Sequence, residues 1–295
     1  MSDTTMKILR IGLPTGSLHE ATLDLFSKAG FSIARSARSY RPAVDDPELS
    51  VSLLRAQEVS RFVEGGYLDF GLTGRDWIYE NDSQVEVLGD LAFSKATSNP
   101  TRWVVAVPED SNLHNVKDLE GKRIATEAVG LTRRFLSEHG VNAHIEFSWG
   151  ATEVKAPELV DAVVDITETG SSLRANRLRI LATIMESYPQ LIANQKAFQD
   201  PWKREKMESV KLLLDGALLA RGMVGLKMNL PQQSLAEILK NISALRQPTV
   251  SPLSQEGWLA LETVLPEKVV RECIPTLKRL GAEGIIEYPL NKVVY

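Results

Sequence analysis

Short apolar runs alternate with amphipathic stretches along most of the chain. Runs rich in Val, Ile and Leu are typical of buried strands, and a 3.6-residue apolar period is typical of helices. Strands are expected at residues 7–13, 31–34, 49–54, 68–72, 85–93, 103–107, 122–126, 143–149, 162–166, 179–185 and 191–194. Helices are expected at residues 18–29, 56–64, 75–79, 116–119, 131–139 and 201–221. Such alternation predicts α/β layers with largely parallel sheets, in two lobes that form a cleft.

The last part of the chain has a different pattern. Strands are expected at residues 224–230, 249–253, 258–264 and 284–288, with helices at 233–245 and 267–280. The order is βαββαβ, which is that of a ferredoxin-like unit. A small-ligand sensor or an assembly domain is the natural expectation for this part.

Composition excludes several classes of protein. The 295 residues are 43% apolar and 24% charged, with a net charge of −4, so a general nucleic-acid binder is not expected. No apolar run is long enough for a bilayer, and residues 1–6 lack a signal pattern, so we expect no membrane partner and a cytoplasmic protein. The single Cys273 excludes an intrachain disulfide and a cysteine metal site. The four scattered His residues indicate neither a triad nor a histidine metal cluster.

A turn of hydroxyl residues around one glycine follows the strand expected at 162–166. Its polar positions are Thr167, Glu168, Thr169, Gly170, Ser171 and Ser172. A strand that ends in such a turn at a helix N-terminus is suited to bind phosphate; the helix expected from Ser172 would carry Arg174, Arg177 and Arg179. Asp165 and Glu168 repel phosphate but suit sugar hydroxyls or Mg²⁺, so a phosphorylated sugar would satisfy the whole set. An ordinary strand–turn–helix connection capped by Ser and Thr fits these residues equally well.

Two more glycine turns follow expected strands. One contains Gly16 and Ser17, and the other contains Thr73 and Gly74. Ligands of open α/β sheets bind at the carboxyl ends of strands, so the three turns fit one shared cleft.

The residues 161–173 (DAVVDITETGSSL) resemble the phosphoribosyl-pyrophosphate loop of the ATP phosphoribosyltransferases of histidine biosynthesis. Similar segments, in family order, occur at residues 9–18, 53–57, 69–74, 121–126 and 150–154, and those at 248–253 and 281–285 resemble the regulatory domain of the long form. The resemblance implies two lobes like those of periplasmic binding proteins and an ACT/PII-like regulatory domain. The first lobe would span 1–95 and be completed by 183–222, the second lobe 96–182, and the regulatory domain 223–295.

The resemblance also implies a reaction. N1 of ATP would attack C1 of phosphoribosyl pyrophosphate, giving N1-(5-phospho-ribosyl)-ATP and pyrophosphate, with Mg²⁺ as cofactor, histidine as inhibitor, and dimers that assemble into hexamers. Adenine N1 needs no strong base. Fixed cations around the leaving pyrophosphate, a metal and acids near the ribose are what the transition state requires.

Residue roles follow from the same resemblance. Arg41 and Arg55 would face the pyrophosphate, although surface salt-bridging describes most arginines. Asp165 and Glu168 would hold ribose hydroxyls or Mg²⁺, with Glu168 alternatively a helix-capping acid, and residues 169–172 would cradle the 5-phosphate. Glu153 would lie near the ribose or adenosine, or else be solvated surface.

Three further positions, Leu245, Thr249 and Gly284, resemble those that line the histidine site, and Leu245 is equally a helix-end core residue. One departure concerns the first turn, where the family usually has Pro-Lys-Gly and this chain has Thr15 in place of Lys. Trp103 and Trp149 are expected in the core rather than as adenine platforms. Two rival functions remain: a non-catalytic small-ligand binding protein and a catalytically silent regulatory subunit.

Overall fold

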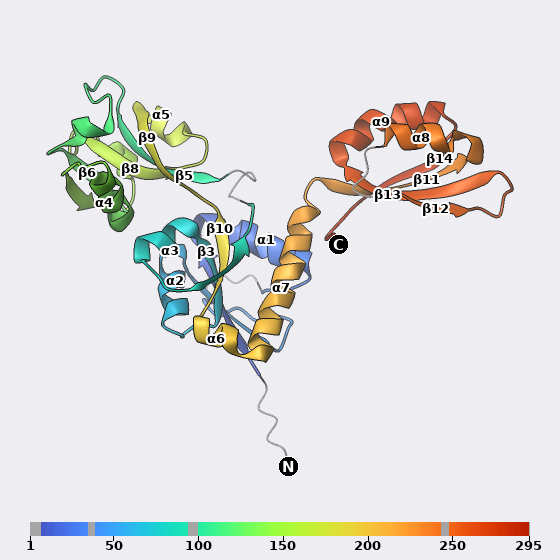
Figure 1. Ribbon diagram of the computed structural model, residues 1–295, viewed down its shortest axis with the longest axis horizontal. Coiled ribbons are helices and arrows are strands. Elements are labelled where there is room, and N and C mark those ends of the chain that lie inside the picture. Colours follow the sequence, from blue (N-terminus) through green and yellow to red (C-terminus); the bar gives the residue numbers. More distant parts are fainter. Residues whose placement is uncertain (1–6, 35–38, 94–99, 243–247, 295) are drawn as a thin grey trace, which may run out of the picture. The chain divides into compact units, whose positions relative to one another are not determined.

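The computed structural model describes residues 7–34, 39–93, 100–242 and 248–294. The chain separates into two compact units, residues 1–27 with 31–211 and residues 28–30 with 212–295. The first unit holds two five-stranded sheets, and the second holds one four-stranded sheet (Figure 1). This is the α/β architecture with a separate C-terminal domain that the sequence predicts.

The first sheet, the core of lobe I, is built from two separate parts of the chain. Its order is β2 (Leu49–Arg55), β1 (Leu9–Thr15), β3 (Phe70–Gly74), β10 (Pro189–Ala193) and β4 (Glu86–Asp90). β1 runs parallel to β2 and β3, whereas β10 runs antiparallel to both of its neighbours. The sheet is therefore mixed rather than largely parallel. The expected strand at residues 31–34 is only an isolated bridge between Ile33 and Val44.

The second sheet, the core of lobe II, has the same mixed character. Its order is β7 (His144–Phe147), β6 (Arg123–Thr126), β8 (Ala162–Thr167), β5 (Thr101–Pro108) and β9 (Leu178–Ser187). β6 runs parallel to β7 and β8, whereas β5 runs antiparallel to β8 and β9. The chain leaves this sheet at Ser187 and enters the first sheet at Pro189 (Figure 1).

The helices of lobe I are η1 (Gly16–Leu18), α1 (His19–Ala29), α2 (Ala56–Glu64), α3 (Arg75–Asn81), α6 (Gln195–Gln199) and α7 (Pro201–Leu219). The last of them, α7, continues into the second unit.

Close packing between a helix and a strand explains one glycine of lobe I. Val59 and Val63 of α2 are fully buried with Ile192 of β10. A Cβ at Gly71 would lie 2.6 Å from Val59, so α2 can approach β3 only because this position is glycine.

Lobe II contains η2 (Val116–Leu119), α4 (Val129–Glu138), η3 (Thr152–Val154) and α5 (Ser171–Ala175). The helix expected to carry three arginines is much shorter than predicted. α5 ends at Ala175, so it carries Arg174 alone of the three. Arg177 has a left-handed φ of 53°, which ends the helical path, and Arg179 already belongs to β9.

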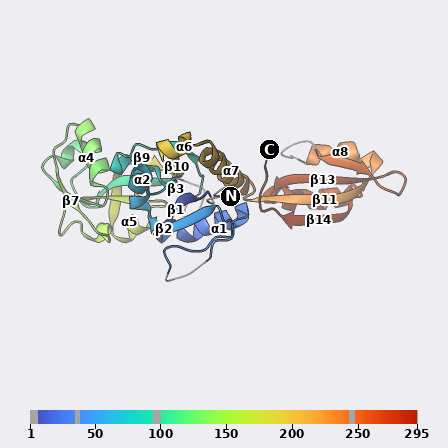
Figure 2. The same ribbon diagram turned by 90° about the horizontal axis from the view of Figure 1, so that it is seen from below.

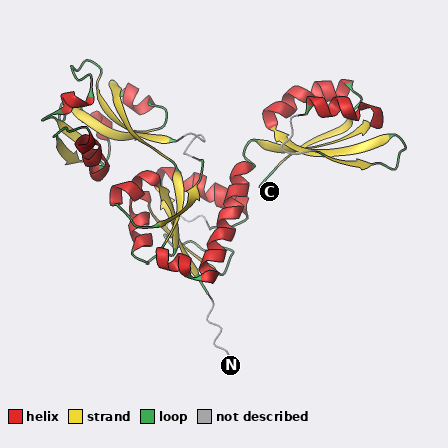
Figure 3. Cartoon of the chain, viewed as in Figure 1, coloured by secondary structure: helices red, strands yellow, loops and turns green. Residues whose placement is uncertain are grey.

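The C-terminal unit has the βαββαβ order that the sequence predicts. The elements are β11 (Met223–Pro231), η4 (Gln232–Ser234), α8 (Leu235–Asn241), β12 (Thr249–Pro252), β13 (Trp258–Pro266), α9 (Glu267–Arg279) and β14 (Glu283–Pro289). The antiparallel sheet has the order β12-β13-β11-β14. Figure 2 shows β13, β11 and β14 of this sheet. α8 and α9 cover one face of it (Figure 3), and Ile238, Val270 and Leu277 are fully buried there. None of the helices in the described part of the chain is long and apolar enough to cross a membrane.

Candidate functional site

The carboxyl ends of β1 and β2 meet side by side. Thr15 is paired in register with Arg55, and the Thr15 hydroxyl donates a hydrogen bond of 3.1 Å to the carbonyl of Leu54. Gly16 follows with a left-handed φ of 81°, and both Gly16 and Ser17 are exposed. Because parallel strands end at the same sheet edge, the first glycine turn and Arg55 belong to one surface.

The two arginines that the sequence singles out lie near the end of β2. Arg55 is the last residue of β2 and precedes α2, and Arg41 lies in the loop before β2. The carbonyl of Tyr40 accepts a 2.8 Å hydrogen bond from the N–H of Leu53, which ties that loop to the strand. Both arginine side chains are exposed, and neither makes a hydrogen bond or ion pair with another described residue. Their guanidinium groups are therefore available to an anion.

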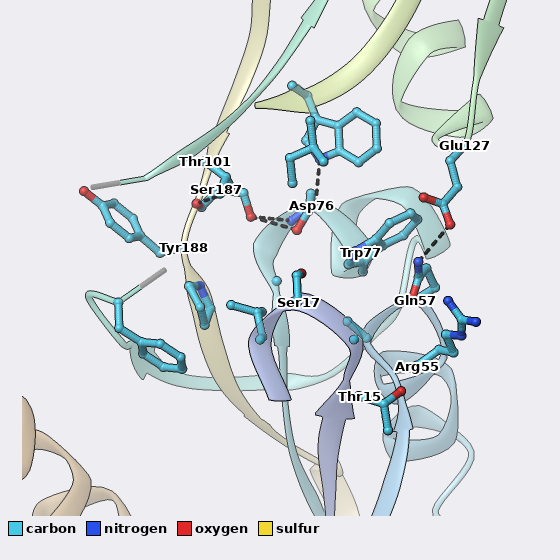
Figure 4. A pocket seen from close by; sticks show the side chains of 18 residues that line it. Thr15, Ser17, Arg55, Gln57, Asp76, Trp77, Thr101, Glu127, Ser187 and Tyr188 are labelled. Atoms are coloured by element: carbon cyan, nitrogen blue, oxygen red, sulfur yellow. Dashed lines mark hydrogen bonds between the residues drawn. The ribbon is translucent and has the colours of Figure 1, made fainter. Parts of the chain in front are cut away.

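A cavity of about 260 Å³ opens where the two sheets' lobes meet (Figure 4). Its polar lining comes from Thr15, Ser17, Arg55, Gln57, Asp76, Thr101, Glu127 and Ser187, and its apolar lining includes Leu18, Trp77, Phe93, Trp103, Ile166 and Pro189. Of the site residues predicted from the sequence, Gly16, Ser17, Arg55 and Gly74 line this cavity. Thr73 does not, because its buried hydroxyl donates to the carbonyl of Ala56 at 2.7 Å.

A buried carboxylate in this cavity was not among the candidate residues. Asp76, at the start of α3, is 3% exposed. It accepts hydrogen bonds from the indole N–H of Trp103 at 2.6 Å and from the hydroxyl of Ser187 at 2.7 Å (Figure 4). Burial raises the pKa of Asp76, and these hydrogen bonds partly offset that effect. Its partners lie far away in the sequence, so a local pattern could not have revealed it.

A hydrogen bond also crosses from lobe I to lobe II at the cavity. The amide of Gln57, on α2, donates to the carboxylate of Glu127 at 2.8 Å (Figure 4). Gln57 lies in the segment 53–57 that resembles the family, but neither Gln57 nor Glu127 is among the predicted site residues.

The hydroxyl turn after β8 is an open, internally hydrogen-bonded turn. The hydroxyl of Thr167 accepts the N–H of Gly170 at 2.8 Å, so Thr167 holds the turn together rather than facing solvent. Gly170 has a left-handed φ of 74°, and the hydroxyl of Thr169 donates to that of Ser171 at 3.1 Å. Thr169, Ser171 and Ser172 are exposed, which leaves their hydroxyls accessible to a ligand.

Two acids lie beside this turn. The carboxylate of Glu153 accepts a short hydrogen bond from the Ser172 hydroxyl, and chiefly for this reason the pKa of Glu153 is lowered. The pKa of Asp165 is raised to about 6, first by burial and then by the negative charges of Glu153 and Glu127. Glu168 is half-buried at the start of the turn. The structure thus brings Asp165 and Glu153 close together beside the turn.

These acids fit a Mg²⁺ site shared with substrate phosphates better than a site made of protein ligands alone. No group of three or more His, Cys, Asp or Glu side chains among the described residues is arranged to hold an ion. Mg²⁺ is commonly held by one or two carboxylates together with substrate phosphates, and Asp165, crowded by negative charge, is a suitable ligand of that kind.

A second hollow, of about 330 Å³, lies on the sheet of the C-terminal unit. Thr249 and Gly284 both line it, together with Lys227, Asn229, Ser251 and Glu262. Leu245, the third expected residue, lies outside the described residues.

One expectation about the tryptophans was wrong. Trp103 is 1% exposed and belongs to the core as predicted, but Trp149 is 92% exposed. Trp149 follows β7 and packs edge-to-face on Phe147, which is itself half exposed. The prediction failed because Trp149 lies two residues beyond the end of β7, which is itself an edge strand.

Two α/β lobes, a cavity with an arginine at strand ends, and an acid-flanked hydroxyl turn define a protein that handles phosphorylated small ligands. Comparison with known protein families identifies the family within this class. The ATP phosphoribosyltransferase family model (HisG) matches residues 55–216, and the model of the HisG C-terminal domain matches residues 220–292. The chain belongs to the ATP phosphoribosyltransferase family.

Individual relatives agree with this assignment. The chain is 58% identical over 288 residues to the ATP phosphoribosyltransferase of Chlorobium luteolum, covering 98% of each chain. It is 57% identical over 286 residues to that of Pelotomaculum thermopropionicum, covering 97% of this chain and 99% of that one. A solved ATP phosphoribosyl transferase (HisG:HisZ) complex from Thermotoga maritima superposes with a TM-score of 0.60 at 25% identity, over 70% of this chain and 99% of that chain.

Proposed function

We propose that this chain joins N1 of ATP to C1 of phosphoribosyl pyrophosphate and releases pyrophosphate, as the first step of histidine biosynthesis in the cytoplasm. The supporting observation is that Arg55 and the Gly16–Ser17 turn from lobe I, and Ile166 just before the hydroxyl turn of lobe II, line the same cavity. A cation suited to the leaving group thus lines the cavity, and the strand that leads into the hydroxyl turn reaches the same cavity at Ile166.

In this proposal the hydroxyl turn binds the sugar phosphate. Thr169, Gly170, Ser171 and Ser172 surround the 5-phosphate, and Thr167 fixes the turn through the N–H of Gly170. Glu153 and Asp165 accept the ribose hydroxyls, while Asp165 and Glu168 are the proposed ligands of Mg²⁺. When bound, the metal would neutralise charge on the pyrophosphate as it leaves.

The arginines act on the leaving group. Among the residues that the structure describes, the guanidinium groups of Arg41 and Arg55 have no hydrogen-bond or ion-pair partner, and their planar forks match phosphate oxygens. Gly16, Ser17 and Gly74 line the cavity beside Arg55 and would meet the remaining phosphates, whereas Thr73, at the buried end of β3, would only support them. Thr15 supplies no positive charge there, because a threonine hydroxyl is neutral, and it donates its hydrogen bond to the carbonyl of Leu54.

The chemistry needs no base on the protein. Adenine N1 has a free lone pair, so the protein's work is to align N1 with the anomeric carbon and to stabilise charge on both sides of the breaking bond. The absence of a triad in the sequence is consistent with this.

The C-terminal unit is the proposed histidine sensor of a homo-oligomer that forms dimers and hexamers. Support comes from the hollow lined by Thr249 and Gly284, where the ion pair between Glu262 and Lys227, 3.4 Å apart, would open to meet the two charges of a free amino acid. Leu245 is retained as a proposed part of this site.

The decisive experiment mixes the purified chain with ATP, phosphoribosyl pyrophosphate and Mg²⁺. Mass spectrometry should detect the phosphoribosyl adduct of ATP, and a coupled assay should detect an equal amount of pyrophosphate. A ligand-binding protein or a silent subunit would bind one or both compounds and release no pyrophosphate.

A further inference from the structure

We propose that residues 290–294, the tail segment that follows β14, transmit inhibition by histidine from the C-terminal unit to the catalytic cavity through helix α1. This inference rests on the proposed function, since it names the route between the proposed histidine hollow and the proposed active site.

The tail segment caps the carboxyl end of α1. Within the C-terminal unit, which includes residues 28–30, the ammonium of Lys292 donates a 2.6 Å hydrogen bond to the carbonyl of Ala29, the last residue of α1. The last carbonyls of a helix lack partners inside the helix and carry the negative end of its dipole, so a lysine stabilises them. Gly30 leaves room for this contact, because a Cβ there would lie 2.9 Å from Nζ of Lys292.

The tail segment is also seated on α7, in the part of that helix that belongs to the same unit. The N–H of Val293 donates a 2.9 Å hydrogen bond to the carbonyl of Gly216. A Cβ at Gly216 would lie 2.9 Å from the side chain of Val294 and 3.0 Å from the carbonyl oxygen of Val293. Glycine is unfavourable inside a helix, so the close approach of the tail segment explains why it stands here.

The other end of the tail segment leads to the hollow of the C-terminal unit. β14 contributes to the lining of this hollow, and Tyr288 near its end donates a 2.6 Å hydrogen bond to the carboxylate of Glu262. The same carboxylate oxygen pairs with Lys227. A charged ligand that engages Glu262 therefore competes with Tyr288, four residues before Lys292, and changes how the end of β14 is held.

Helix α1 connects the capped carbonyl to the catalytic cavity. It follows directly on Gly16–Leu18, which line that cavity, and its Leu25 and Phe26 are fully buried. The hydroxyl of Thr22 is also fully buried and has no hydrogen-bond partner among the described residues. A buried hydroxyl without a partner is costly, so a shifted position of α1 has a free-energy gain to offer. Such a shift, set at Ala29, would move the turn at the other end of the helix.

A purely structural tail segment is the competing explanation. Its loss would lower the stability of the protein and leave the effect of histidine on catalysis intact. Transmission predicts the opposite result, in which histidine still binds but no longer lowers the activity, because the coupling between the two sites is lost.

The test uses Lys292→Met, which loses the charge and the donor but keeps most of the side chain. Lys278→Met, at an exposed lysine of α9, is the matched control. Calorimetry measures the Kd of histidine, and pyrophosphate release measures kcat/KM with and without saturating histidine. In Lys292→Met we expect an unchanged Kd and uninhibited kcat, while the factor by which histidine lowers kcat/KM becomes at least about 5-fold smaller.

A second variant displaces the tail segment without altering its sequence. Gly216→Ala favours helix α7 by its intrinsic propensity, but its Cβ would push Val293 and Val294 away. It should reduce the effect of histidine as Lys292→Met does. An unchanged inhibition factor in either variant would overturn the proposal.

A further measurement needs neither substrate nor histidine. Hydrogen–deuterium exchange of the peptide that covers residues 16–24 should be faster in Lys292→Met and Gly216→Ala than in the wild type, because a helix loses protection cooperatively when one end is released. Exchange in α4 should not change. Equal rates at residues 16–24 would refute the link through α1. Faster exchange in the variants, with a wild type that histidine does not inhibit, would refute the proposed histidine sensor and leave this link standing.

Discussion

Arg10 and Asp69 form a two-point ion pair at the amino-terminal edge of the first sheet. Nε and Nη2 of Arg10 lie 3.0 and 2.8 Å from the two carboxylate oxygens of Asp69. Lys203 of α7 lies 2.8 Å from the same carboxylate, which is 3% exposed. The cluster therefore joins β1, the residue before β3 and the first turn of α7.

Removing the carboxylate of Asp69 should destabilise the protein without changing the cavity that Arg55 and Asp76 line. We expect Asp69→Asn to lower the free energy of unfolding by about 2 kcal/mol, less than for a fully buried pair because Arg10 and Lys203 are partly exposed. Chemical denaturation measures this. Glu208→Gln, which breaks an exposed pair with Arg204 on α7, is the control and should change stability by at most about 0.5 kcal/mol.

The same carboxylate sets a pH dependence. Burial alone would raise the pKa of Asp69, but hydrogen bonds from Arg10 and Lys203 lower it. Because the pKa of Asp69 is lower in the native state than in the unfolded state, its ionisation stabilises the native state. This stabilisation is fully present above the unfolded-state pKa of about 3.9 and is lost as the pH falls through the native-state pKa. The difference between wild type and Asp69→Asn should thus persist from pH 7 to 5 and shrink below pH 4; an unchanged difference at pH 3 would contradict this account.

Arg55→Ala should impair turnover much more than folding. Because the guanidinium contacts no other described side chain, we expect the thermal midpoint to shift little while kcat falls about 100-fold. Steady-state kinetics and thermal unfolding on the same sample decide the matter. Arg61→Ala, an exposed arginine on α2, is the matched control. Parallel losses of kcat and stability would argue against a role in catalysis.

Asp165 should make the unliganded protein less stable as the pH rises. Its native pKa of about 6 lies above the unfolded value, so the native state binds the extra proton and the contribution of Asp165 to stability declines between about pH 4 and 6. We expect Asp165→Asn to be more stable than the wild type by about 2 kcal/mol at pH 7.5 and nearly equal to it at pH 4. Chemical denaturation of both proteins at pH 4 and at pH 7.5 tests this prediction. A stability difference that does not depend on pH would exclude the raised pKa of Asp165.

Gly284→Val should weaken inhibition by histidine. Gly284 lines the hollow of the C-terminal unit with a φ of 57°, so a β-branched side chain there would both narrow the hollow and strain the backbone. We expect the half-inhibitory concentration to rise at least about 10-fold, measured as pyrophosphate release against histidine concentration. Gly257→Val has a similar φ of 77° in the same unit but open space around it, and it controls for strain alone.

Sequence patterning predicted the regular elements well where burial determined them. The fully buried β3 and β10 and the amphipathic α2 lie within two residues of their expected bounds, because apolar periodicity reports burial directly. Periodicity failed where backbone geometry or edge position decided the outcome, as at Arg177 and Trp149.

The candidate site was partly predictable for a similar reason. Turn chemistry and the family resemblance indicated Gly16, Arg55 and the hydroxyl turn, which are local features. Asp76 and Glu127 gained their significance only from Trp103 and Gln57, to which no sequence spacing connects them. Thr167 was placed in the right turn, and the structure shows its hydroxyl holding the turn from within.

The position of β10 between β3 and β4 has a consequence for how the protein is made. Neither of these earlier strands pairs with the other, so each presents an unsatisfied edge until residues 189–193 have left the ribosome. The sheet built from residues 101–187 is contiguous in the chain and can close first, whereas the amino-terminal sheet must wait for β10, which joins β4 to the other strands. The nascent amino-terminal segment therefore depends on protection from aggregation during the synthesis of nearly a hundred later residues.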